Sequence, residues 1–220
     1  MAKDKDDKPA STRALAVSGF TVPVTAAWLL AVGGILSWGM PVEGLLENAG
    51  KVAAAVGGGV AFLTVVLSAV QDIVPLQLKT RALFLKGEKS LPSYRAFSGG
   101  LMATEKLDFV TDLETVKADA ESQNKRWSEH YDKYRDHQAV APFSARHVAW
   151  RETAVVLVLL VLISAVFVIA AMFGWLMHLC LWAWLLLACL ILLAMSVVAG
   201  RNSSDALVIA VLERAWIDRA

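Results

Sequence analysis

Three long stretches of the chain carry no charged residue. They cover residues 14–42, 52–71 and 153–200, and contain 29, 20 and 48 residues. A helix needs about 20 apolar residues to cross the hydrocarbon core of a bilayer, so the first two stretches each accommodate one span and the third accommodates two. The pattern therefore predicts an all-α integral membrane protein with four transmembrane helices.

The expected helices follow from these stretches. Lys3, Lys5, Lys8 and Arg13 precede the first one, as in a secretory signal peptide. The apolar stretch is too long for a signal peptide and shows no convincing cleavage site, so we expect a retained helix near 17–38. The other spans are expected near 51–74, 152–173 and 179–199, with a tight turn containing Gly174 between the last two.

The polar parts of the sequence define the remaining units. Residues 1–13 have almost no apolar side chains and predict a disordered tail. Residues 14–75 and 152–200 are expected to form two transmembrane hairpins, with a charged helical domain at 76–151 between them. That domain is short for an independent core, so we expect it to lean on the membrane helices or on another subunit. Residues 201–220 predict a separate C-terminal helix from Asp205, capped by 202–204, which lies on the inner leaflet or packs under the membrane helices.

The basic residues set the expected orientation. Of the 21 Lys and Arg residues, 4 precede the first stretch, 13 lie between 79 and 151, and 3 follow residue 200, which leaves only Lys51 on the other side. The positive-inside rule then places both termini and the 76–151 domain of a multi-pass plasma-membrane protein in the cytoplasm.

Composition excludes several functions. The net charge of +1 gives no electrostatic basis for a direct nucleic-acid partner. The spans hold no charge at depth, which argues against a transporter, and Asp72 is expected only at headgroup level. No catalytic or nucleotide-binding motif is present, and His130, His137 and His147 lack metal-ligand spacing. We therefore expect no enzyme, no cofactor and no metal.

Two segments of the 76–151 domain are candidate ligand or partner-binding sites. The loop 91–100 combines turn-forming residues with Tyr94, Arg95 and Phe97, which suit a phosphate or a base, or alternatively pin the loop beneath the membrane helices. After residue 107 an apolar stripe with helical spacing leads to Gln123, Asn124, Trp127 and Tyr131. These four side chains suit a ligand or partner, or alternatively a helix–helix interface. Thr111 and Glu114 predict a capping box at one helix start.

A third candidate lies in the second span. Ala53, Gly57 and Ala61 recur every four residues, a spacing at which small side chains let helices in lipid approach closely. They predict packing within one subunit, an interface between subunits, or a helix that lines a pore.

The four spans, the charged insert and the minimal outer turns together resemble small membrane components of bacterial anti-phage defence systems. The resemblance implies a membrane protein that senses infection or breaches the membrane when signalled. We therefore expect an oligomeric sensor or effector that contacts membrane lipid and a cytoplasmic partner protein or small signalling ligand. A gated pore made of several copies is one form of it, and a non-conducting scaffold that recruits an effector protein is the alternative.

Overall fold

The computed structural model describes residues 21–34, 91–98 and 100–219, together with the short pieces 69, 73–75 and 78–79. All regular elements in these residues are helical, which confirms the all-α part of the prediction for the described chain. In order they are the Thr21–Gly34 helix, the 3-10 helices η2 (Pro92–Arg95) and η3 (Thr104–Leu107), and the α-helices α5 (Leu113–Ala118), α6 (Ala120–Tyr134), α7 (Ala141–Met172) and α8 (Leu179–Ile217).

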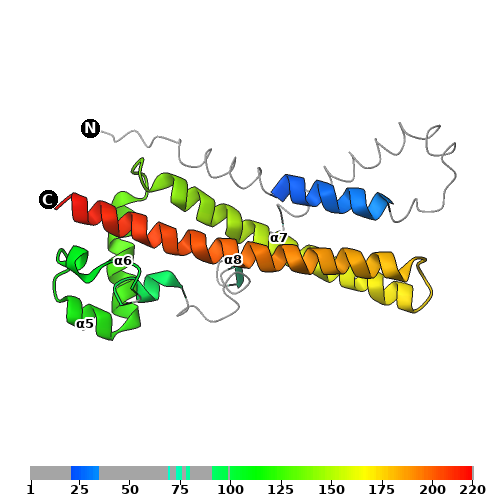
Figure 1. The fold of residues 1–220 in the computed structure, drawn as a ribbon, viewed down its shortest axis with the longest axis horizontal. Coiled ribbons are helices and arrows are strands. Elements are labelled where there is room, and N and C mark those ends of the chain that lie inside the picture. Colours follow the sequence, from blue (N-terminus) through cyan, green and yellow to red (C-terminus); the bar gives the residue numbers. More distant parts are fainter. Residues whose placement is uncertain are drawn as a thin grey trace.

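Helices α7 and α8 form a long hairpin that organises the rest of the molecule (Figure 1). They contain 32 and 39 residues, which at 1.5 Å per residue gives lengths of about 48 and 58 Å. Both are long and apolar enough to cross a membrane, and they are the two such helices among the described residues. Many large apolar side chains on them are exposed, among them Leu162, Trp184 and Met195 at 58, 68 and 63 %. Such a surface suits lipid rather than water.

Two of the four expected spans are only partly described. The Thr21–Gly34 helix is apolar but has 14 residues, fewer than a full span needs, and it lies within the range expected for the first one. The second expected span, 51–74, lies outside the described residues apart from 69, 73 and 74. Ala53, Gly57, Ala61 and Asp72 are therefore not described.

The turn between α7 and α8 lies where the sequence predicts it. Residues 173–178 connect the two helices, and Gly174 has a φ of 77°, in the left-handed region that glycine enters without a steric penalty. His178 also has a positive φ, 65°, and directly precedes α8.

The predicted separate C-terminal helix is wrong, because α8 runs without interruption from Leu179 to Ile217. Ser203 and Ser204, expected as part of a cap, are instead buried inside α8, and Gly200 is a lone glycine that a packed helix tolerates. Similarly, α7 begins at Ala141, eleven residues before the expected start at Glu152, with a proline in its first turn. In both helices the charged residues mark where the apolar surface ends, not where the helix ends.

Helix capping in the 91–140 region also differs from expectation. The residue before α5 is Asp112, with a φ of 57° and no side-chain cap, so the predicted Thr111–Glu114 capping box is wrong. The side-chain cap belongs to the next helix, where an Asp119 carboxylate oxygen accepts a hydrogen bond of 2.8 Å from the backbone N–H of Ser122 at the start of α6.

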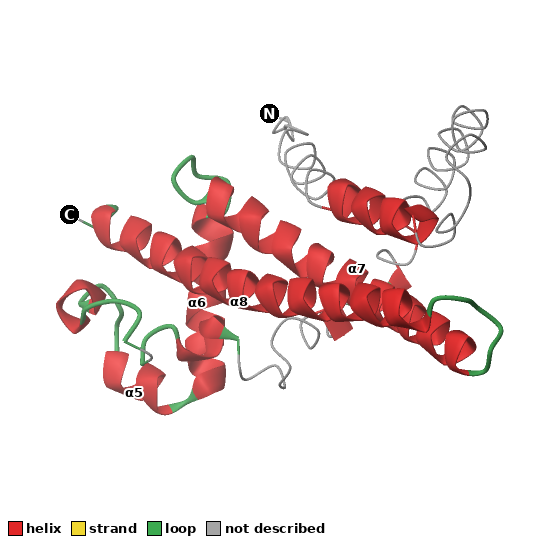
Figure 2. Ribbon diagram, turned by 45° about the vertical axis from the view of Figure 1, so that its right-hand side comes forward, coloured by secondary structure: helices red, strands yellow, loops and turns green. Residues whose placement is uncertain are grey.

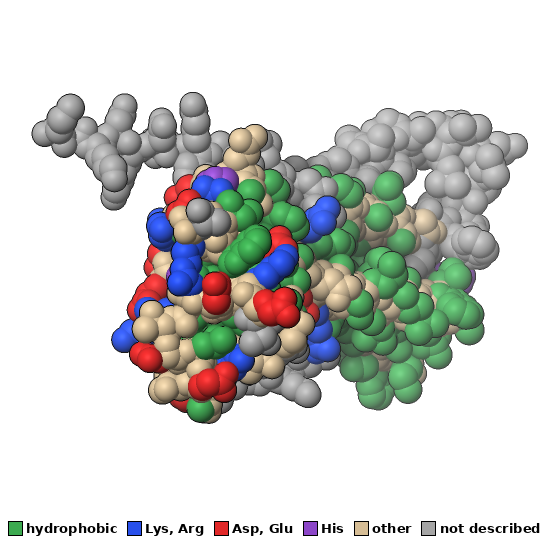
Figure 3. Space-filling view, turned by 60° about the vertical axis from the view of Figure 1, so that its left-hand side comes forward, with side chains coloured by type: hydrophobic (Ala, Val, Ile, Leu, Met, Phe, Trp, Pro, Cys, Tyr) green, Lys and Arg blue, Asp and Glu red, His purple; other side chains and the backbone are tan. Residues whose placement is uncertain are grey.

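Residues 91–98 and 100–140, here called the polar domain, pack against the last third of α8 (Figure 2). Figure 3 shows the same division on the surface, because charged side chains gather at this end of the molecule and hydrophobic side chains cover the other end.

Candidate functional site

The polar domain does not form a core of its own but completes one with α8. One apolar cluster joins Phe97, Leu107 and Val110 of the domain to Val208 and Leu212 of α8, and all five are 5 % exposed or less. The sequence predicted that this domain leans on the membrane helices or on another subunit, and the structure packs it against the part of α8 that lies beyond the uncharged segment.

A second cluster seals the same interface from the α6 side. It contains Tyr134 at the end of α6, Val140 just before α7, and Leu207, Val211 and Ala215 of α8. The buried positions of α8 in the two clusters, 207, 208, 211, 212 and 215, form a stripe at helical spacing. The spacing of these residues can be read from the sequence, but only the tertiary structure shows that they face the polar domain.

Ion pairs surround the apolar part of this interface. Lys106 lies 4.0 Å from Glu213 and 5.3 Å from the ring centroid of Trp216, and Arg219 lies 3.5 Å from Asp108. These pairs are half-exposed, so each contributes little to stability by itself.

The end of α8 is joined to α6 through Asp218. The hydroxyl of Tyr134 donates to its Oδ2 at 2.9 Å, Lys133 lies 3.2 Å from the same oxygen, and Arg214 lies 2.9 Å from the other. The hydrogen bond from Tyr134, and after it the one from Lys133, lowers the pKa of Asp218. Interaction with Tyr134, and after it with Asp218, raises the pKa of Lys133. Each shift favours the charged form of its group.

The loop expected to bind a ligand is turned inward. Phe97 is 3 % exposed and belongs to the first apolar cluster, and Tyr94 is half-buried in η2. Arg95 is the last residue of η2, and its side chain lies outside the described part of the chain.

Gln123 of α6 holds this loop in place. Its side-chain oxygen accepts a hydrogen bond of 3.1 Å from the backbone N–H of Phe97, and its amide nitrogen donates to the Ser98 hydroxyl at 2.9 Å and to the Lys117 carbonyl at 3.0 Å. Gln123 is 3 % exposed. The structure thus brings Phe97 and Gln123, which belong to two separate candidate sites in the sequence, into direct contact, and leaves neither with surface for a ligand.

The other residues of α6 that were predicted to bind a ligand or partner also pack against the protein. Trp127 and Tyr131 stack with ring centroids 5.0 Å apart and planes 11° apart, and both pack at the α8 interface. The Tyr131 hydroxyl also forms a 2.8 Å hydrogen bond with the hydroxyl of Ser144 in α7. Asn124 is half-buried beside Gln123. Trp127 and Tyr131 lie where a helix–helix interface would place them.

Two contacts were missed by the reasoning from sequence. Glu152, only 6 % exposed, pairs at 2.8 Å with Lys79 and at 2.8 Å with Arg151, at the edge of the uncharged part of α7. Within the uncharged part, the Trp28 indole N–H donates to the Ser164 hydroxyl at 3.0 Å and joins the Thr21–Gly34 helix to α7. The available signal for the second contact was Ser164, a polar residue within a long apolar segment, and nothing in the sequence paired Lys79 with Glu152.

Among the residues that the structure describes, no three or more His, Cys, Asp or Glu side chains gather as a metal ion would require. Comparisons of the chain with protein-family models, with curated proteins and with solved structures found no match. The part of the chain that the structure describes is all-helical, with two helices able to cross a membrane and a polar domain built onto the end of the second.

Proposed function

We propose that this protein is an oligomeric sensor or effector of the bacterial inner membrane, in which a signal received by the polar domain reaches the membrane helices through α8. The observation that carries this proposal is the continuity of α8. Its part from 179 to 200 is uncharged, and its part from 201 to 217 supplies one side of the polar domain's core. Any displacement of the domain on ligand or partner binding must therefore move, tilt or strain this helix.

The geometry suits transmission rather than independent motion. A packed apolar interface shifts between discrete arrangements because its side chains interlock. The two clusters, the three ion pairs from the domain to α8 and the Tyr131–Ser144 hydrogen bond to α7 hold the domain against both helices of the hairpin. In our proposal the polar domain and both termini are cytoplasmic, and the Thr21–Gly34 helix belongs to a first hairpin of a four-span protein.

The output that we propose is a gated pore, formed by several copies. The exposed apolar faces of α7 and α8 are available for lipid and for neighbouring copies, and an uncharged constriction gates by excluding water. The topological resemblance to membrane components of anti-phage defence supplies the biological setting of the proposal.

A non-conducting scaffold is the second candidate. It is favoured by the charged surface of α6, where Lys125, Glu129, Asp132 and Lys133 are exposed beside the tightly held core. A partner protein recognised by these charges could be recruited to the membrane without any movement of α8.

Membrane potential distinguishes the two. We would follow it with a voltage-sensitive dye in bacteria that express the chain with its neighbouring genes, before and during phage infection. The matched variants are Leu212→Ala, which removes a fully buried side chain from the α8 interface, and Ile217→Ala, which changes a 53 % exposed side chain on the same helix.

The pore proposal predicts depolarisation on infection with the wild type and Ile217→Ala, and its loss with Leu212→Ala at equal membrane abundance. Protection from phage at a steady potential would support the scaffold instead. If neither potential nor survival depends on the chain, the role in defence is wrong.

A further inference from the structure

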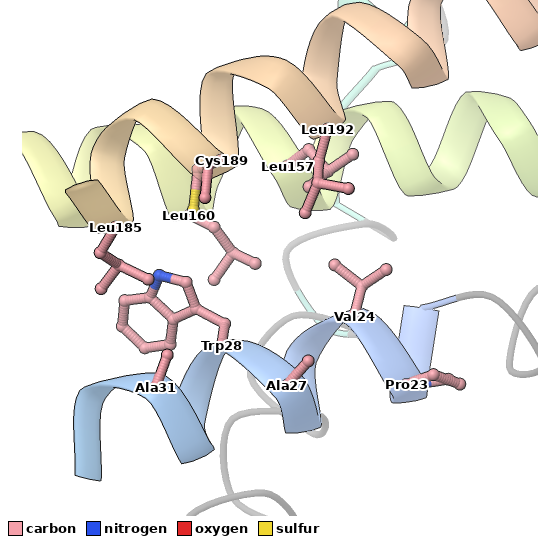
Figure 4. A pocket seen from close by; sticks show the side chains of 11 residues that line it. Pro23, Val24, Ala27, Trp28, Ala31, Leu157, Leu160, Leu185, Cys189 and Leu192 are labelled. Carbon is pink, nitrogen blue, oxygen red and sulfur yellow. The ribbon is translucent and has the colours of Figure 1, made fainter. Parts of the chain in front are cut away.

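We infer that the groove between the Thr21–Gly34 helix and the α7–α8 hairpin is a binding site for one acyl chain of a membrane phospholipid. The inference rests on the membrane location of the hairpin but not on its signalling role. The groove has a volume of about 400 Å³, and all eleven residues that line it are apolar. They come from the Thr21–Gly34 helix, from α7 and from α8 (Figure 4).

The groove exists because small and large residues alternate around it. Ala27 and Ala31 on one side and Ala188 on the other leave the space that longer side chains would fill, and all three are exposed at its rim. Between them the Trp28 indole reaches from its helix toward the hairpin and keeps the helices apart (Figure 4). The opening thus lies at the surface of the uncharged region.

Trp28 is held firmly, so the groove is formed before anything binds. Its N–H donates to Ser164, its ring stacks on Phe167 with centroids 6.2 Å apart, and only 7 % of it is exposed. That hydrogen bond uses the indole's only donor, so the ring offers the groove an apolar face. A preformed site of this kind binds its ligand without the entropic cost of ordering the side chains that line it.

The chemistry of the walls selects the occupant. Water is unfavourable in this groove because it would find no polar partner there. If the groove were empty, the side chains that line it would lose dispersion contacts on that side. The volume lies within the range of about 300–1,000 Å³ typical of small-molecule sites. At the depth of Leu160 and Leu185, inside the uncharged parts of α7 and α8, phospholipid acyl chains are the abundant molecules of matching polarity. An acyl chain therefore completes the packing between the Thr21–Gly34 helix and the hairpin.

Photolabelling tests this site directly. The full chain is placed in phosphatidylcholine nanodiscs that contain a phosphatidylcholine with a diazirine in one acyl chain, irradiated, digested and analysed by mass spectrometry. Ala188→Phe fills the groove, and Ala183→Phe is the matched control, since Ala183 is exposed on the same helix but does not line the groove. We expect labelling at Ala27, Ala31 and Leu192 in the wild type and in Ala183→Phe, and its loss in Ala188→Phe.

Labelling of the exposed face around Trp184 and Ile191 serves as an internal reference. If that face is labelled but the groove is not, as occupation by a second protein copy would give, the acyl-chain site is wrong while the membrane location stands. Groove labelling that persists in Ala188→Phe also overturns it. If neither the face nor the groove is labelled, the hairpin does not lie in the bilayer, and the inference falls with the membrane location.

Thermal stability provides a second readout that does not depend on labelling. Removal of bound phospholipid with detergent should lower the Tm of the wild type and of Ala183→Phe. It should lower the Tm of Ala188→Phe less, because in that variant the phenyl ring already occupies the space of the lipid acyl chain. Equal shifts in all three proteins would contradict a specific site.

Discussion

The Tyr134 hydroxyl donates a 2.9 Å hydrogen bond to the carboxylate of Asp218, 84 residues further along the chain. Tyr134 ends α6 and Asp218 directly follows α8, so this bond ties the last turn of the long helix to the polar domain. Lys133 and Arg214 contact the same carboxylate.

This bond predicts a specific dependence of stability on pH. Because the pKa of Asp218 is lowered in the folded protein, the carboxylate stabilises the fold fully above its unfolded pKa, and the contribution is lost as pH falls through the folded value. Asp218→Asn should therefore lower the Tm at pH 7, and the difference from the wild type should shrink below about pH 4. Circular-dichroism melts of both proteins over this range measure it. Asp136→Asn, at an exposed position paired only with Arg135 among the described residues, is the control, and an equal pH trend for that variant would contradict the assignment.

Gln123→Ala tests the support of the 91–98 loop. The change leaves the buried backbone N–H of Phe97 without its acceptor, which costs about 1–3 kcal/mol. Amide hydrogen exchange of residues 91–98 should accelerate, as should proteolysis of this loop. Asn124→Ala, at the half-buried neighbouring position, should leave exchange unchanged. Equal protection in both variants would mean that the apolar contacts of Phe97 suffice.

Glu152→Ala tests the buried ion pairs at the edge of the uncharged segment. The side chains of Lys79 and Glu152 are 12 % and 8 % exposed, so removal of the carboxylate leaves a shielded cation unpaired. We expect a loss of about 3–5 kcal/mol in the free energy of unfolding, measured in mixed detergent micelles. Glu129→Ala, which removes a pair at 39 % and 50 % exposure, should cost at most about 1 kcal/mol. Similar losses in the two variants would show that the burial of Glu152 does not increase the contribution of its ion pairs to the free energy of unfolding.

A double-mutant cycle tests the hydrogen bond between Trp28 and Ser164. Trp28→Phe removes the N–H and Ser164→Ala removes its acceptor, and bonds of this kind between membrane helices couple by about 0.6 kcal/mol on average. The free energies of unfolding of the two single variants and the double variant give the coupling. Thr25→Val is the control partner for Ser164→Ala, because the Thr25 hydroxyl bonds to the Thr21 carbonyl within its own helix. A coupling near zero in the Trp28 cycle would show that the helix is held by apolar contacts alone.

The residues predicted to bind a ligand show why a single sequence misleads at such positions. Tyr94, Phe97, Gln123 and Trp127 combine aromatic and amide groups, and the same groups serve a binding site or a buried joint. The sequence singled out these residues in two separate segments, each as a binding site or as a packing contact. It contained no information on which side of the domain α8 would cover, and that decides whether they meet a ligand or the protein interior.

The sequence by itself determined the helical class, the uncharged segments, the turn at Gly174 and the separation of a polar region from an apolar one. These are properties of local composition, which helix length and hydropathy translate directly into structure. Only the tertiary structure decided that α8 continues through Ser203 and Ser204, that its last third completes the core of the polar domain, and that Trp28 crosses to Ser164 beside an open groove. The physical reason is that each depends on a partner distant in the chain. Whether a serine caps a helix or lies buried within it depends on what packs against that serine. Whether an apolar stripe faces lipid or another domain likewise depends on what packs against the stripe.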